Sequence, residues 1–104
     1  MSTRDKVRQA LEKLLQAAEA GDRKDGVMSD GYGGVLLSLE MSEVASMAEC
    51  SRSTAAKHLE ALMADEGYAR YRPLRNAGCY LYGRDSSPFL QWANGQPIPS
   101  GGGA

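Results

Sequence analysis

Residues 42–66 hold two helical patterns separated by a tight turn, and this arrangement constrains the fold more than any other feature of the sequence. The second helix, expected over 52–66, begins after Ser51, whose hydroxyl group is suited to cap it. The residues spaced to form its buried face are Ala55, Leu59, Leu62 and Met63. We therefore predict that this helix packs its apolar face against a core.

The first helix is expected over 42–49, with Ser42 as its candidate cap. Ala45 is small, which lets the second helix cross closely. The residues expected to face inward are Val44, Ala45, Met47 and Ala48. We predict two helices that pack tightly across the turn.

The exposed face of the second helix carries the residue types that read the major groove of DNA. Arg52 can donate two hydrogen bonds to a guanine, and Ala56 is small enough to approach a thymine methyl group. The free N–H groups of a helix N-terminus attract phosphate. The candidate DNA contacts here are Ser51, Arg52, Ser53, Thr54, Ala56, Lys57 and His58. We interpret this helix as a recognition helix, and the alternative is an ordinary amphipathic helix with a solvated face.

Residues 68–84 predict two strands joined by a turn, with turn-forming residues at 76–78. Tyr80 and Tyr82 are expected to pack the hairpin. The candidate DNA contacts here are Arg70, Arg72, Arg75 and Asn76. A basic hairpin suits contact with phosphate or the minor groove, and the alternative is a solvated strand face.

The net charge of the whole chain is −1, which argues against a general affinity for nucleic acid. Within residues 51–84, however, six Arg and Lys residues stand against three acids, and the acids of residues 36–50 precede this segment. Only the local potential matters at a contact surface. Positive charge is therefore concentrated where a recognition helix and hairpin would meet DNA.

The segment 43–62 resembles the helix-turn-helix of winged-helix transcriptional regulators of bacteria and archaea. The matching residues are Glu43, Val44, Ala45, Ser51, Arg52, Ser53, Thr54, His58, Leu59 and Leu62. The resemblance covers residues 38–84, and it departs from the family pattern at Glu49, where glycine is usual, and at Cys50, where an aliphatic residue is common. It implies a mainly α fold with a small β-hairpin, as a three-helix core plus wing. It also implies a repressor-like regulator that binds double-stranded DNA in a sequence-specific manner.

The rest of the chain is expected to support this unit. Residues 1–20 predict an amphipathic helix for the core or a dimer contact, 21–34 a Gly-rich loop, and 35–84 the winged helix-turn-helix domain. Residues 85–104 predict a flexible tail, in which Phe89 and Trp92 are candidates to dock on the domain or on a partner.

Other functional classes find less support in the sequence. We expect no enzyme, cofactor, metal or membrane segment, and a cytoplasmic location because no export signal is apparent. A metal or redox role for Cys50, His58 and Cys79 is an alternative. Because one recognition helix covers a short half-site, a homodimer is expected. The rival functions are a winged helix for protein contact and an RNA-binding or replication-associated module.

Overall fold

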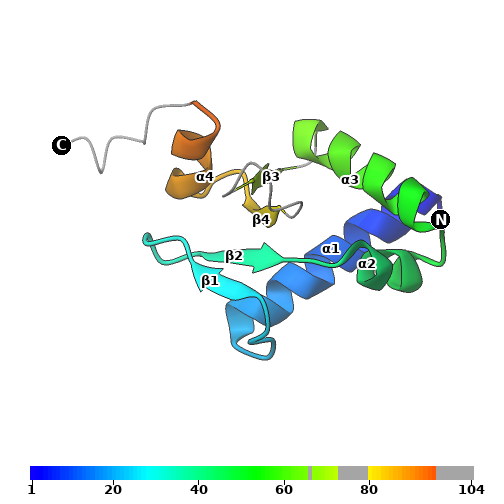
Figure 1. The fold of residues 1–104 in the computed structure, drawn as a ribbon, viewed down its shortest axis with the longest axis horizontal. Coiled ribbons are helices and arrows are strands. Elements are labelled where there is room, and N and C mark those ends of the chain that lie inside the picture. Colours follow the sequence, from blue (N-terminus) through cyan, green and yellow to red (C-terminus); the bar gives the residue numbers. More distant parts are fainter. Residues whose placement is uncertain (66, 73–79, 96–104) are drawn as a thin grey trace.

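The computed structural model describes residues 1–65, 67–72 and 80–95, which form four helices and a four-stranded antiparallel sheet (Figure 1). In chain order these are α1 (Thr3–Ala20), β1 (Val27–Ser29), β2 (Val35–Ser38), α2 (Met41–Ala48), α3 (Arg52–Asp65), β3 (Tyr68–Tyr71), β4 (Leu81–Arg84) and α4 (Pro88–Ala93). The strand order in the sheet is β1-β2-β4-β3. The chain is a small α+β domain, and no helix among the described residues is long and apolar enough to cross a membrane.

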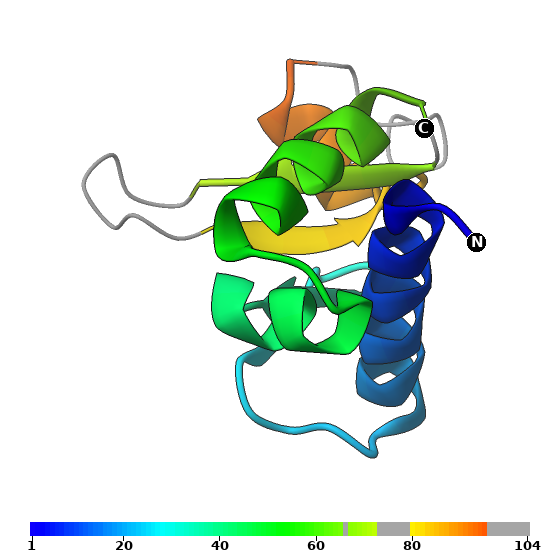
Figure 2. The same cartoon turned by 90° about the vertical axis from the view of Figure 1, so that its right-hand side faces the viewer.

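The sheet lies between two apolar clusters of unequal size. Successive side chains of a strand point to opposite faces, so Leu37 and Tyr82 face the cluster formed with α1, α2 and α3. Their neighbours Leu36 and Leu81 face a smaller cluster with Leu90 of α4. Figure 2 shows α1, α2 and α3 packed around one another with α4 behind the sheet. The three-helix side therefore holds the main core.

The helical patterns of the sequence are confirmed, with small changes at the helix ends. Ser51 caps α3, since its Oγ accepts the N–H of Thr54 at 3.2 Å. Ala55, Leu59 and Leu62 are fully buried, and Met63 is partly buried. The expectation that Ser42 caps the first helix is wrong, because α2 begins one residue earlier and its N-cap, Glu40, makes no side-chain cap bond.

Met47 of α2 is exposed rather than inward-facing, whereas Val44, Ala45 and Ala48 are buried as expected. In α1 the apolar stripe faces the core. The buried residues of that stripe are Val7, Ala10, Leu11, Leu14, Leu15 and Ala18. The apolar face of α1 is therefore occupied within the domain.

The segment 21–34 is not a continuous loop, because β1 forms within it and pairs with β2 through Val27↔Leu37 and Ser29↔Val35. Asp30 closes the hairpin: its Oδ1 accepts the N–H groups of Tyr32 at 2.7 Å and Gly34 at 2.9 Å. The expectation of a mainly α fold with one small hairpin is corrected accordingly. The sheet has two hairpins, joined where β2 pairs with β4.

The segment 85–95 is likewise not a flexible tail, since α4 packs on the sheet. Ser87 caps this helix, and its hydroxyl donates to Asp30 Oδ2 at 2.7 Å. Leu90 is fully buried over Gly83, where an added Cβ would lie 2.7 Å from Leu90 Cδ1. A glycine in β4 thus lets α4 approach closely. Residues 96–104 lie outside the described part of the chain.

Candidate nucleic-acid interface

The N-terminal turn of α3 presents a cluster of hydroxyl groups. Ser51 Oγ lies 2.8 Å from Thr54 Oγ1, to which it donates, and 3.2 Å from Ser53 Oγ. Ser51 and Ser53 are exposed and Thr54 is half-buried. The first N–H groups of a helix carry partial positive charge, so this turn offers both backbone and hydroxyl donors to an anion.

The solvent face of α3 also carries two exposed cations, Arg52 and Lys57. Neither forms an ion pair with any residue that the structure describes. Ala56 precedes Lys57 and His58 follows it, and both are half-buried. The predicted contacts of α3 are thus brought together on its first two turns.

Arg70 and Arg72 lie at the far end of β3, beside Tyr80. Arg70 pairs with Tyr82, whose side chain faces the core side of the sheet, and Arg72 follows two residues later. Side chains two residues apart in a strand share a face, so both arginines lie on the side of the sheet that α3 covers. Arg75 and Asn76 lie outside the described residues.

Figure 2 shows the relation between α3 and the β3–β4 pair. The beginning of α3, the end of β3 and the beginning of β4 lie toward the same side of the molecule. Arg72 directly follows β3 and Tyr80 directly precedes β4. The start of α3 and the end of β3 thus lie on one side of the molecule, and the polar and cationic residues of these segments are here called the basic side: Ser51, Arg52, Ser53, Thr54, Lys57, Arg70 and Arg72.

Arg84 belongs to residues 51–84 but is neutralised elsewhere. It binds both carboxylate oxygens of Glu12 and lies 3.0 Å from Glu19 Oε1, both on α1. Tyr68 also donates to Glu12, at 2.6 Å. The positive charge counted over this segment from the sequence is thus larger than the charge available to a ligand.

The Arg84–Glu12 pair changes the pKa values of the groups around it. Hydrogen bonding from Arg84 lowers the pKa of Glu12 to about 2, although burial acts in the opposite direction. Burial, followed by the hydrogen bond to Glu12, raises the pKa of Tyr68 to about 12. The same pairing raises the pKa of Arg84. Both partners therefore stay charged, and their ion pair connects α1 to the sheet.

The turn before α3 shows how the chain accommodates Glu49 at the position where the winged-helix pattern usually has glycine. This residue is the C-cap of α2 and adopts the left-handed conformation, with φ 57° and ψ 46°. Cys50 follows, and its N–H donates to Ala45 O at 3.0 Å. Glu49 therefore adopts the conformation that glycine supplies most easily, and the tight turn forms without glycine.

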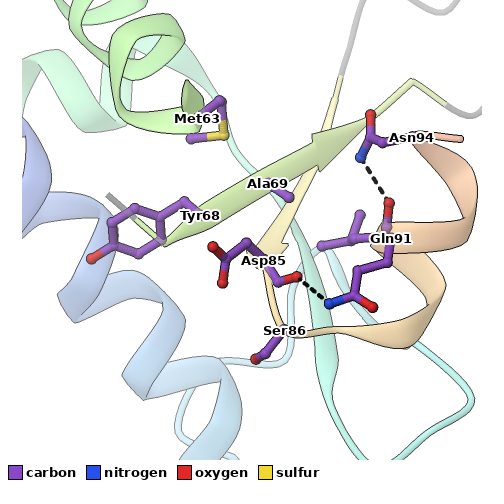
Figure 3. Close-up of a pocket in the computed structure, with 8 residues that line it drawn as sticks. Met63, Tyr68, Ala69, Asp85, Ser86, Gln91 and Asn94 are labelled. Atoms are coloured by element: carbon purple, nitrogen blue, oxygen red, sulfur yellow. Dashed lines mark hydrogen bonds between the residues drawn. The ribbon is translucent and has the colours of Figure 1, made fainter. Parts of the chain in front are cut away.

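A pocket of about 490 Å³ lies between α3, β3 and α4, away from the basic side (Figure 3). Met63 near the end of α3 and Tyr68 at the start of β3 line it, opposite the ends that carry Arg52 and Arg72. Its wall is fixed by Asn94, whose Nδ2 donates to Leu90 O at 2.8 Å. The pocket contains none of the DNA contacts predicted from the sequence.

The thiol and imidazole groups do not gather into a site within the described residues. No three His, Cys, Asp or Glu side chains there are placed to hold a metal ion. Cys50 is half-buried and packs against the main core. Cys79 lies outside the described part of the chain, so the alternative that it binds a metal together with Cys50 and His58 stays a prediction.

Comparisons with protein-family models, curated proteins and solved structures found no match for this chain. The case for function therefore rests on the geometry of the basic side. The sequence did not single out Tyr80 as a contact of Arg70 and Arg72 on that side. The signal present in the sequence was its place opposite two arginines in the expected hairpin.

Proposed function

We propose that this chain is a transcription regulator that binds double-stranded DNA in a sequence-specific manner, with the winged-helix arrangement. In this proposal α3 enters the major groove, and β3 and β4 form the wing and lie on the adjacent backbone. The observation that carries it is the basic side itself. Its cations are exposed or half-exposed and are not neutralised by acids of the described chain, whereas Arg84, Arg23 and Lys6 are paired with acids elsewhere.

Each part of the basic side has a distinct role in this proposal. Arg52 reads a base edge, because it stands in the first turn of α3. Ser51, Ser53 and Thr54 donate to phosphate oxygens together with the N–H groups of the helix start. Arg72 contacts the backbone beside the groove. Such a division gives specificity to the helix and affinity to the wing.

A second copy of the chain would extend the short half-site that one helix covers. The apolar stripe of α1 faces the core, so α1 does not offer it to a partner. An exposed aromatic surface lies on α4, where Trp92 is 58% exposed and its ring centroid lies 6.0 Å from that of Phe89. We therefore place the proposed homodimer contact on α4 rather than on α1.

The rival function, protein contact through α3, calls for an apolar groove on that helix. Of the α3 side chains that the structure describes, the exposed ones are instead charged or hydroxylic: Arg52, Ser53, Lys57 and Glu60. This composition favours a polyanion over an apolar partner.

Selection of bound fragments from random duplex DNA, followed by fluorescence anisotropy, tests the proposal. We expect one enriched sequence that binds at least about 1000-fold more tightly than unrelated duplex. Arg52→Ala should reduce this preference by about 1–3 kcal/mol, whereas Lys13→Ala, which removes an exposed cation from α1, should not reduce it. Enrichment in an RNA pool and not in the duplex pool would instead assign the basic side to RNA.

A further inference from the structure

The Tyr80 ring is in contact with two arginine side chains at the end of the β3–β4 pair. The Cζ atom of Arg70 lies 4.1 Å from the centroid of the Tyr80 ring, and that of Arg72 lies 4.7 Å from it. Arg72 Nη2 also donates a hydrogen bond to the Tyr80 hydroxyl at 2.9 Å. Because Tyr71 pairs with Leu81, continuing the register sets Arg72 opposite Tyr80. One aromatic ring therefore holds two guanidinium groups.

This arrangement holds like charges together without an acid to neutralise them. Neither arginine forms an ion pair with a carboxylate in the part of the chain that the structure describes. The attraction of a cation to the ring face stabilises each arginine. A guanidinium group over a ring keeps its in-plane N–H donors available, and each arginine carries five of them. Arg72 uses one of its donors on the Tyr80 hydroxyl and Arg70 also interacts with Tyr82, so the pair is cationic and keeps its other donors for a ligand.

We infer that Tyr80 organises Arg70 and Arg72 into a clamp for phosphate oxygens, here called the arginine clamp. Planar guanidinium donors match the oxygens of phosphate in bidentate geometry. The identification of the phosphate as a DNA phosphodiester rests on the proposed function, whereas the binding of phosphate by the clamp does not. Tyr80 acts through the arginines and is a positioning residue.

The ordering of the arginines is what Tyr80 contributes to binding. A free arginine side chain loses rotamer freedom when it is fixed on a ligand, and a side chain that is already stacked loses less. Removal of the ring should therefore weaken binding without removing a phosphate contact. Removal of an arginine should do both.

The first experiment is an NMR titration of the free full-length chain with inorganic pyrophosphate, observed at the arginine Nε–Hε groups. In the wild type we expect the ring current of Tyr80 to shift the Nε–Hε resonances of Arg70 and Arg72. As pyrophosphate is added, we expect the chemical shifts of both resonances to change together and to reach a plateau. Tyr80→Leu should abolish the ring displacement and weaken pyrophosphate binding about fivefold or more. Tyr80→Phe, which keeps the ring, should retain the displacement and bind within about threefold of the wild type.

Tyr32→Leu is the matched control, because Tyr32 is an exposed tyrosine on the β1–β2 turn. It should leave both arginine signals and pyrophosphate binding unchanged. Absence of a pyrophosphate response at Arg70 and Arg72 in the wild type would overturn the arginine clamp. Unchanged pyrophosphate binding in Tyr80→Leu would overturn the role of Tyr80.

The second experiment measures affinity for duplex DNA over a range of salt concentrations. Tyr80→Leu should weaken binding about fivefold with an unchanged salt dependence, since both arginines still meet phosphate. A Tyr80→Leu variant whose salt slope falls by about one would contradict a positioning role. A wild type that binds pyrophosphate at the clamp but no duplex would refute the proposed function and leave the clamp standing.

Discussion

Glu12 and Arg84 lie 72 positions apart in the sequence and are joined by two hydrogen bonds in the fold. The pair ties α1 to β4, the strand that lies between β2 and β3 in the sheet. The proposed wing is β3 and β4, so the same contact connects it to the three-helix core. The β3–β4 pair is therefore tied to α1 at the end of β4 that lies away from Tyr80.

Acid should weaken this tie. The pKa of Glu12 is lowered to about 2 from an ordinary value of 4.5, so the stabilising contribution of its carboxylate is complete above pH 4.5 and is lost as the pH falls toward 2. The free energy of unfolding of the wild type should fall over this pH range, and we predict that it falls less in Glu12→Gln. Urea unfolding at pH 6, 4 and 2.5 measures it. Parallel pH profiles of the two proteins would show that Glu12 does not contribute.

The turn at Glu49 offers a stabilising substitution. A residue other than glycine in the left-handed conformation costs about 1–2 kcal/mol, and the ion pair of Glu49 with Lys6 is exposed and 3.5 Å long, so it offsets little of this cost. We predict that Glu49→Gly raises the free energy of unfolding by about 0.5–1 kcal/mol. Thermal unfolding measures the change. Glu49→Ala, which keeps a Cβ, serves as the control and should not be stabilising, and a drop in stability of the glycine variant would contradict the strain.

The contact of Gly83 with Leu90 should be visible as a coupling between substitutions. An added Cβ at Gly83 would lie 2.7 Å from Leu90 Cδ1 and 3.2 Å from Val35 O, so Gly83→Ala should destabilise the fold by about 1–3 kcal/mol. Leu90→Ala should cost about 2–5 kcal/mol on its own. Denaturant unfolding of the double variant should show a loss smaller than the two single losses added. Strict additivity would indicate that α4 does not pack over Gly83.

These contacts also show why part of the fold was predictable from the sequence and part was not. The repeat of Ala55, Leu59 and Leu62 is a local signal, because a helix places such residues on one face wherever it packs. The three residues of β1 and the six of α4 are too short for such a signal. They depend on distant partners, as when Ser87 binds Asp30 across 57 positions.

The candidate site likewise has features that were predictable from the sequence and features that were not. The exposed cations of α3 follow from the helical period once its buried face is known, and the structure places them as expected. The neutralisation of Arg84 and the stacking at Tyr80 depend on strand register and on α1. The local pattern of residues predicts neither the register of the strands nor the position of a distant helix.

The most direct test of the central claim compares the wild type, Arg52→Ala and Arg72→Ala for affinity to the selected duplex and to an unrelated duplex over a range of salt concentrations. Arg52→Ala should lose about 1–3 kcal/mol on the selected duplex and little on the unrelated one. Arg72→Ala should weaken binding to both equally and lower the salt slope by about one. A wild type that binds neither duplex at low salt would contradict the proposal that the basic side binds DNA.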